Sequence, residues 1–241
     1  MDWSGLWLAR DLPGGEPARP RRRGGQPAAG TGEPAEGGRL QRSRAALGAH
    51  QKPLLLVYAK TALGYGGAFT AFTFLAPILQ QVSGFSAGAV SLILLVYGVS
   101  VAVGNIWGGK LADRMGPLPA LKLLFAGLAV VLLVLTFTAP HPVLAVLTVL
   151  VWGAFAFGNV PGLQVLVVKQ AERHTPNAVD VASGLNIAAF NVGIALGSVV
   201  GGFVVEHLGL MHTPWIGALI VLLAYGLTHV SEAGERRAAL A

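Results

Sequence analysis

Cysteine is missing from the 241-residue sequence, and charged residues are scarce at 12%. The missing cysteine excludes disulfide bonds and thiolate metal sites. Soluble domains carry about 25% charged residues, whereas here 54% of residues are hydrophobic and the mean hydropathy is +0.63. A soluble fold of this size cannot hide so much apolar surface, so the composition indicates a chain that is solvated mainly by lipid.

Arrangements that would carry enzyme chemistry are absent too. The sequence has no Ser/His/Asp pattern, no metal-ligand spacing and no phosphate-binding loop, so it predicts neither an enzyme nor a metal or cofactor site. Its Gly-x-Gly patterns lie inside apolar segments, where helix packing accounts for them. His141, His207 and His212 fall in short connections, where solvated surface histidines are expected.

Residues 1–50 differ in character from the rest of the chain. They are rich in Gly, Pro, Ala and Arg and show no apolar periodicity. Such a segment cannot bury enough surface to offset the entropy lost on ordering, so it is predicted to be a disordered arm. The arginines within residues 19–23 would suit the phosphates of nucleic acid or anionic lipid. The acids of the arm and the lack of a binding motif argue against nucleic acid as a partner.

Six long apolar segments follow the arm. A helix rises about 1.5 Å per residue, so about 20 residues cross a hydrocarbon core about 30 Å thick. The sequence therefore predicts an all-α membrane bundle of six transmembrane helices over residues 51–232, followed by a tail at 233–241. The expected spans are 54–79, 87–109, 119–138, 143–168, 180–205 and 214–230.

Basic residues fall on alternate connections between these segments. Lys110, Arg114 and Lys122 flank the second connection, and Lys169 and Arg173 flank the fourth. The other connections hold no Lys or Arg, and they lie at about 80–86, 139–142 and 206–213. Because Lys and Arg accumulate in cytoplasmic loops, we expect a multi-pass protein of the inner membrane with both termini in the cytoplasm. The short tail would then be cytoplasmic.

The second connection carries a compact motif, Gly109-Lys110-Leu111-Ala112-Asp113-Arg114-Met115-Gly116. Gly109 and Gly116 let a neighbouring helix approach or the chain turn. Asp113 can face a helix N-terminus, where the helix dipole favours an anion. Arg114 can pair with an acid or extend to the membrane interface. The alternative interpretation is a cytoplasmic turn with ordinary anchoring charges.

The pattern G-x-L-A-D-R-x-G resembles the signature of the major facilitator superfamily, in a cytoplasmic connection between two helices. Three further stretches look like helices 7, 10 and 11 of such transporters. They are Thr61–Gly64 with Phe72–Pro77, Val151–Ala154 with Val160–Gln164, and Ala182–Gly193 with Gly201–Gly202. Over about residues 44–230 the chain is most similar to the C-terminal half of the drug:proton antiporter branch, which includes arabinose-efflux-type permeases.

This resemblance implies secondary active, proton-linked efflux of a small molecule such as a sugar or a drug. Such transporters have twelve helices in two bundles, and this chain supplies one bundle. It would therefore need a second six-helix half, or a second copy of itself, besides the lipid bilayer, substrate and protons. The alternative is a truncated, non-transporting membrane protein. No acid lies in the middle of the six segments, which favours that alternative because proton coupling needs a group that changes protonation.

Polar side chains inside the apolar segments mark a candidate substrate cavity. Unpaired amides are unfavourable in lipid, so Asn186 and Asn191 should face the bundle interior or a cavity. Asn159 and Gln164 flank Pro161, which can interrupt the fourth helix, and interrupted helices often lie at transporter sites. Hydrogen bonding between helices without a substrate is the open alternative. The resemblance implies that the first, second, fourth and fifth helices line the cavity, which adds Tyr65, Phe69, Thr70, Thr73, Tyr97, Asn105, Trp152, Phe155 and Phe190.

Small residues recur every four positions along the fifth segment, at Ala189, Gly193, Gly197 and Gly201. A stripe of this kind lets two membrane helices approach closely and gain van der Waals energy. We expect this face to pack against another helix. A sliding surface for conformational change is the alternative, and the two roles are compatible.

Lys60 is a cation about two turns into the first segment. An ionisable group at that depth is a functional candidate. The alternative is that its aliphatic stem lies along the apolar surface while the ammonium group reaches the nearer interface.

Overall fold

The fold of the chain was analysed in a computed structural model that describes residues 51–240, with side chains described as far as Ala233. The predicted arm at 1–50 lies outside the described residues, as do most side chains of the tail. The described chain is helical without a strand, which confirms the all-α prediction. Its helices are α2 (Lys52–Phe72), α3 (Leu75–Pro77), the π-helical turn η1 (Ile78–Val82), α4 (Ala87–Met115), α5 (Pro117–Thr138), α6 (Pro142–His174), η2 (Pro176–Ala178), α7 (Val179–His207), η3 (Leu210–His212) and α8 (Thr213–Leu240).

These elements make six spans in the described part of the chain, each long and apolar enough to cross a membrane. The first span combines α2, α3 and η1. Proline stands in the first turn of α2, α5 and α6. Backbone N–H groups in a first turn have no acceptor within the helix, so the lack of an N–H in proline costs no hydrogen bond there. Ser86 caps α4 by accepting a hydrogen bond from the backbone N–H of Ala89 at 3.3 Å. Gly116, with φ of 86°, separates α4 from α5.

The two prolines inside the spans behave differently. Pro161 is a residue that can interrupt a helix, yet α6 continues through it to His174. The first span instead breaks at Thr73–Phe74, just before α3. Pro77 accounts for this break, because a proline ring clashes with the carbonyl four residues earlier, which here belongs to Thr73. The break places a short helical turn and η1 at the end of the span.

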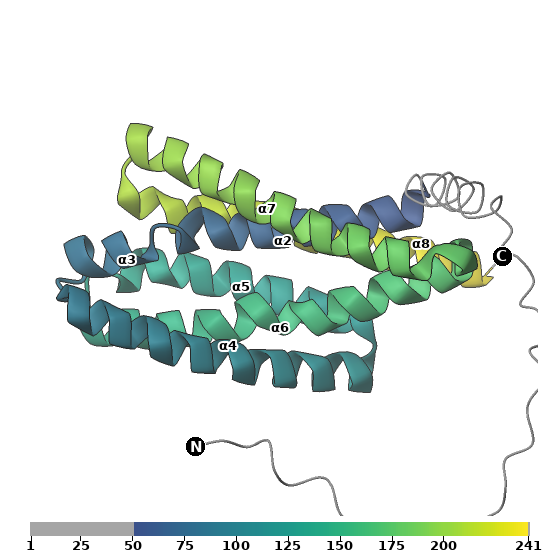
Figure 1. Ribbon diagram of the computed structural model, residues 1–241, viewed down its shortest axis with the longest axis horizontal. Helices are drawn as coiled ribbons and strands as arrows, with labels where there is room; N and C mark the ends of the chain where they lie inside the picture. The colour runs from purple at the N-terminus through teal and green to yellow at the C-terminus, as the bar shows by residue number, and fades with distance from the viewer. Residues whose placement is uncertain (1–50, 241) are drawn as a thin grey trace, which may run out of the picture.

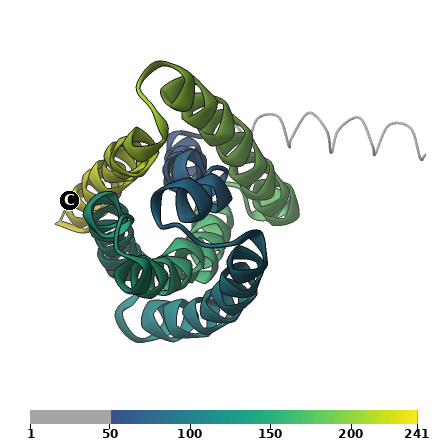
Figure 2. The ribbon, with the colours of Figure 1, turned by 90° about the vertical axis from the view of Figure 1, so that its left-hand side faces the viewer.

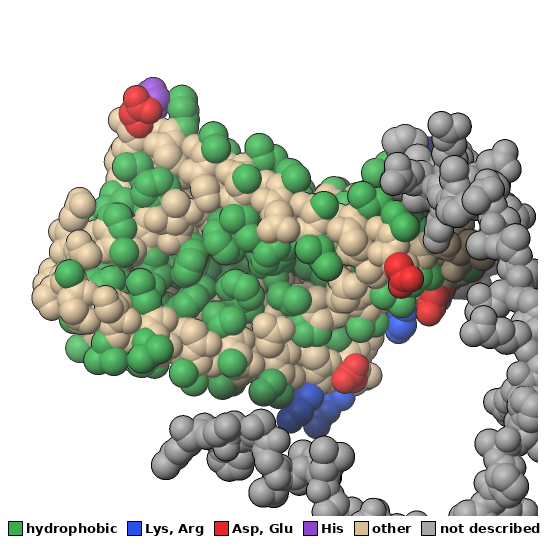
Figure 3. All heavy atoms as spheres, viewed as in Figure 1, with side chains coloured by type: hydrophobic (Ala, Val, Ile, Leu, Met, Phe, Trp, Pro, Cys, Tyr) green, Lys and Arg blue, Asp and Glu red, His purple; other side chains and the backbone are tan. Residues whose placement is uncertain are grey.

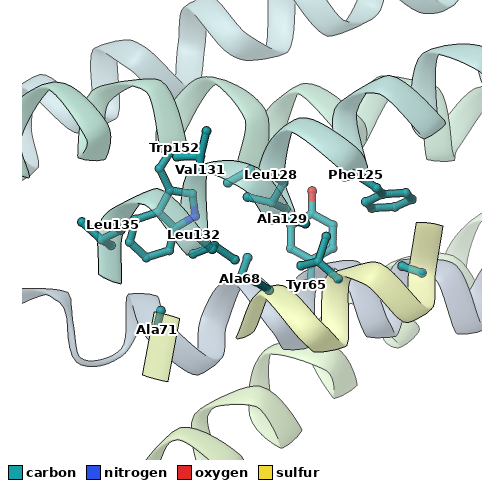
Figure 4. Close-up of a cluster of buried hydrophobic side chains, with 14 of the residues drawn as sticks. Tyr65, Ala68, Ala71, Phe125, Leu128, Ala129, Val131, Leu132, Leu135 and Trp152 are labelled. Carbon is teal, nitrogen blue, oxygen red and sulfur yellow. The ribbon is translucent and has the colours of Figure 1, made fainter. Parts of the chain in front are cut away.

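Helix α2 lies in the middle of the bundle, as the end-on view in Figure 2 shows. It packs against α7 and α8 on one side and approaches α5 and α6 on the other. Helix α6 packs along α4 and α5, and α5 also packs along α8 (Figure 1). The core between α2, α5 and α6 contains Trp152, Tyr65 and Phe125 together with a row of α5 leucines (Figure 4).

Glycines bring three pairs of helices into backbone contact: α4 with α6, α7 with α2, and α2 with α8 where Gly67 meets Gly217. On α4, a Cβ at Gly104 or Gly108 would overlap the backbone of Ala154 or Gly158 on α6. On α7, a Cβ at Gly193, Gly197 or Gly201 would overlap the α2 backbone at the residues Ala62, Gly66 and Thr70. Ala189 stands one turn before Gly193 and is half-buried. The absence of side chains at these crossings sets how closely the helices pack.

The outer surface is apolar along its length. Leu95 on α4 is 69% exposed and Val199 on α7 is 70% exposed, as suits side chains that face lipid or another membrane helix. On the face shown in Figure 3, Lys and Arg gather at one end of the bundle and apolar side chains fill the recess between α7 and α4. Lys122 and Glu232 form an ion pair that joins α5 to α8 near that end.

Candidate functional site

A hollow of about 210 Å³ lies where α2, α6 and α7 meet. Its walls combine amide and hydroxyl groups with aromatic and aliphatic side chains. The lining residues are Thr61, Tyr65, Val160, Leu163, Gln164, Asn186, Ile187 and Phe190. Four of the sequence-derived cavity candidates are therefore brought together here, namely Tyr65, Gln164, Asn186 and Phe190.

A chain of hydrogen bonds links the three helices at the hollow. The Thr61 hydroxyl lies 2.7 Å from Asn186 Oδ1 and donates to it, with the carbonyl of Val57 as a second acceptor at 3.1 Å. Asn186 Nδ2 in turn donates to Gln164 Oε1 over 3.4 Å. Asn186 is thus satisfied from both sides, and the side chain of Gln164 is held with its oxygen toward α7.

Two aromatic rings form the apolar wall of the hollow. Tyr65 on α2 and Phe190 on α7 have ring centroids 3.9 Å apart at an angle of 60°. Tyr65 also meets Phe157 of α6 edge to face at 6.1 Å. Figure 4 shows the Tyr65 hydroxyl directed away from α2 toward Leu128 and Ala129 of α5. The Tyr65 ring therefore lines the hollow, while its hydroxyl points into the core between α2 and α5.

Several buried polar atoms on α2 and α6 lack a hydrogen-bond partner among the described residues. They are the Tyr65 hydroxyl, Trp152 Nε1 and both amide atoms of Asn159. Asn159 is only 1% exposed, so solvent at the surface does not satisfy it. Asn159 and Trp152 are seven residues apart on α6, which puts them on the same helix face. Burying unpaired polar atoms is unfavourable, so this part of the core is polar at the expense of stability.

The remaining cavity candidates lie outside the hollow. Tyr97 stacks on Phe72, and both contact Trp152. Thr70 is buried and donates to the carbonyl of Gly66 on its own helix. The others are distributed over further contacts: Thr73 bonds Ser198, Asn191 is exposed and donates to Ile187 of its own helix, Asn105 is half-buried on α4, Phe69 meets Phe72, and Phe155 meets Trp107.

The connection motif lies at the junction of α4 and α5. Gly109 stands on α4 in ordinary contact with Pro161, and Gly116 supplies the positive φ of the turn. Asp113 and Arg114 are exposed, and neither forms an ion pair with another described residue.

Lys60 is buried, at 1% exposure. Among residues 51–233 it is the one buried charged side chain. The interpretation in which its ammonium reaches the interface does not describe this structure. Lys60 directly precedes Thr61 in the sequence but does not line the hollow. Among the described residues, no three His, Asp or Glu side chains come together as a metal site would need.

Sequence reasoning missed Thr61, Val160, Leu163 and Ile187 as lining residues. A signal for Thr61 exists, because it stands four residues before Tyr65 and therefore shares its helix face. The three aliphatic residues carry no signal, since similar side chains fill every apolar segment.

Comparison with known proteins identifies relatives of this chain. The family profile described as Major Facilitator Superfamily matches residues 4–179. An uncharacterized MFS-type transporter of Bacillus subtilis, YtbD, is 56% identical over 184 residues, which cover 76% of this chain and 46% of that protein. The inner membrane transport protein YdhP of Escherichia coli K12 is 38% identical over 71% of this chain and 43% of its own length.

A third relative carries a substrate in its name. A probable sugar efflux transporter of Helicobacter acinonychis is 30% identical over 72% of this chain and 44% of that protein. The chain thus spans about half the length of the curated relatives it matches. With the family profile covering most of its residues and six membrane-spanning helices in the described part, the chain belongs to the Major Facilitator Superfamily.

Proposed function

We propose that this chain forms the C-terminal six-helix half of a secondary active exporter, and that the hollow between α2, α6 and α7 belongs to its substrate cavity. The observation that carries the proposal is the linked set Thr61, Asn186 and Gln164, which places polar groups at a hollow inside an apolar bundle. The names of the relatives as transport and sugar efflux proteins support an export function.

In this proposal a second six-helix half, or a second copy of the chain, covers the recess between α7 and α4. Substrate would bind between the two bundles, and rocking of one bundle against the other would open the site to each side in turn. The exposed apolar faces of α4 and α7 flank this recess (Figure 3). They would serve as the surface on which the bundles move.

Proton coupling is the part of the proposed function for which this chain lacks a suitable group. A coupling group must change protonation inside the membrane. The middle of the spans contains no Asp or Glu, and the buried Lys60 does not line the hollow. We assign the proton-carrying carboxylate to the other half. Proton movement through the other half would therefore drive export of the sugar or drug through the cavity between the two bundles.

Both termini are proposed to lie in the cytoplasm, and the chain offers a clean test because it has no native cysteine. Single cysteines in place of Lys110 and Glu172 should react with a membrane-impermeant maleimide from the cytoplasmic side alone. Cysteines in place of His141 and His207 should react from the opposite side alone. All four positions are exposed. Labelling of positions 110 and 141 from the same compartment would refute the threading and the orientation together.

The export function itself is tested by reconstitution. If the missing half is a different chain, this chain should be inactive alone in proteoliposomes and should export a probe such as radiolabelled lactose when it is co-expressed with the N-terminal half of the Bacillus subtilis relative. If a second copy is the missing half, the chain alone should export the probe. The measurement is probe movement driven by an imposed proton gradient. Dissipating the gradient with a protonophore should abolish it.

The matched control is co-expression with the C-terminal half of the same relative. If that pairing restores transport and the N-terminal half does not, this chain is the other half of the transporter. If neither pairing moves any probe although the proteins insert and associate, the alternative of a non-transporting membrane protein holds.

A further inference from the structure

The hydrogen bonds at the hollow run in one direction. Thr61 donates to Asn186, and Asn186 donates to Gln164 through its amide nitrogen. The oxygen of Gln164 therefore already accepts one hydrogen bond, while its Nε2 forms none with another described residue. An amide nitrogen carries two donor hydrogens and no acceptor. The polar group at the hollow that this network leaves without any bond is thus the Nε2 donor of Gln164.

The hollow also lacks charge. None of the lining residues within the described chain is acidic or basic. Lys60 adjoins Thr61 in sequence, but neighbouring residues on a helix do not share a face, and Lys60 is not part of the lining. A charged group that enters an apolar hollow without a counter-charge loses its hydration and gains little in return. The hollow therefore favours an uncharged ligand.

Size and shape restrict the ligand further. Drug-sized sites measure roughly 300–1,000 Å³, so a hollow of about 210 Å³ holds one part of a molecule. A cavity of about 150 Å³ in another protein accommodates benzene, and a ring with one small substituent fits the present volume. The Tyr65 and Phe190 rings supply flat apolar walls on which such a ring can pack.

We propose that the hollow binds a neutral, ring-bearing molecule whose hydrogen-bond acceptor receives an amide proton of Gln164. Thr61 and Asn186 act as positioning residues, because they fix which end of the Gln164 amide faces the ligand. This inference rests on the proposed transport function only in naming the ligand as the substrate. The binding site itself is testable without transport.

Three probes of nearly equal shape separate the possibilities. Benzamide is neutral with a carbonyl acceptor, benzamidine is a cation that only donates, and benzoate is an anion that only accepts. Their dissociation constants are measured by saturation-transfer NMR on the full chain in lipid nanodiscs, with empty nanodiscs as background. Benzamide should bind about tenfold more tightly than either ion. Benzamidine has no acceptor for the Gln164 donor, and benzoate accepts but loses its hydration without a counter-charge.

The substitution Gln164→Glu should reverse this preference. A carboxylate of the same shape accepts but does not donate, so benzamide should weaken about tenfold and benzamidine should gain about tenfold. Gln81→Glu is the matched control, because it adds the same charge at an exposed position of η1 outside the hollow. It should leave all three dissociation constants unchanged.

The positioning role of Thr61 is tested by the ratio of benzamide to benzamidine affinity. Thr61→Val removes the first donor, so the ratio of benzamide to benzamidine affinity should fall, and Thr61→Ser should restore it. A wild-type preference for benzamidine or benzoate, equal binding of all three probes, or no binding at all would each overturn the inference. None of these results would bear on the reconstitution experiment, where transport by the paired halves is measured directly.

Discussion

Replacing Gly108 with alanine is expected to lower the melting temperature of the bundle by roughly 10 °C, whereas the same replacement at Gly98 should leave it unchanged or slightly raised. A Cβ at Gly108 would overlap the backbone of Gly158 on α6. Backbone atoms cannot move aside as a side chain can, so the two helices must separate along their crossing. Overpacking typically costs about 1–3 kcal/mol, and each kcal/mol lowers the melting temperature by roughly 2–4 °C for a domain of this size.

Gly98 provides a matched control on the same helix. Nothing lies within 4 Å of a Cβ built there, and alanine is favoured over glycine inside a helix by about 0.5–1 kcal/mol. The two variants are compared by thermal unfolding in mild detergent, with the monodisperse fraction followed by size-exclusion chromatography. Equal melting temperatures for the two variants would mean that α4 and α6 do not touch at Gly108, contrary to the structure.

The number and type of the spans could be predicted from the sequence because they depend on hydropathy summed over about 20 residues. The interruptions could not, because they depend on single residues. Pro161 stays inside a continuous α6, while Pro77 coincides with the break after α2. A proline within a span removes one backbone hydrogen bond in either case. The same proline chemistry therefore accompanies a break in one span and a continuous helix in another, and the sequence alone does not distinguish the two.

The residues of the site could also be predicted only in part, because the sequence does not fix which way each side chain of a membrane helix faces. Asn186 and Asn191 are five residues apart, which rotates them by about 140° around α7 at 3.6 residues per turn. Asn186 is buried and bonds across to α2 and α6, while Asn191 is exposed and bonds its own helix. The unfavourable burial of an unpaired amide applies to both residues. This cost predicts that each amide has a hydrogen-bond partner. It does not predict where the partner lies, since an amide can also bond the backbone of its own helix.

Replacing Asn159 with leucine is expected to stabilise the bundle, against the usual effect of a core substitution. Both amide atoms of Asn159 are buried without a partner among the described residues. Leaving a buried polar group unsatisfied costs about 1–3 kcal/mol, and leucine has a similar volume without polar atoms. A gain of about 1–2 kcal/mol would raise the melting temperature by roughly 2–8 °C. Thermal unfolding under the same detergent conditions measures it.

The same substitution at Asn186 should have the opposite sign. Asn186→Leu takes one of two acceptors from the hydroxyl of Thr61 and leaves the oxygen of Gln164 without its donor, so the melting temperature should fall. If Asn159→Leu also destabilises the bundle, its amide has a bonded partner such as a buried water. If it stabilises the bundle while reducing probe export by the paired halves, Asn159 is retained at the expense of stability because transport needs it. Proteins commonly break a local folding rule where they function, and the unpaired amide of Asn159, next in sequence to the lining residue Val160, fits that pattern.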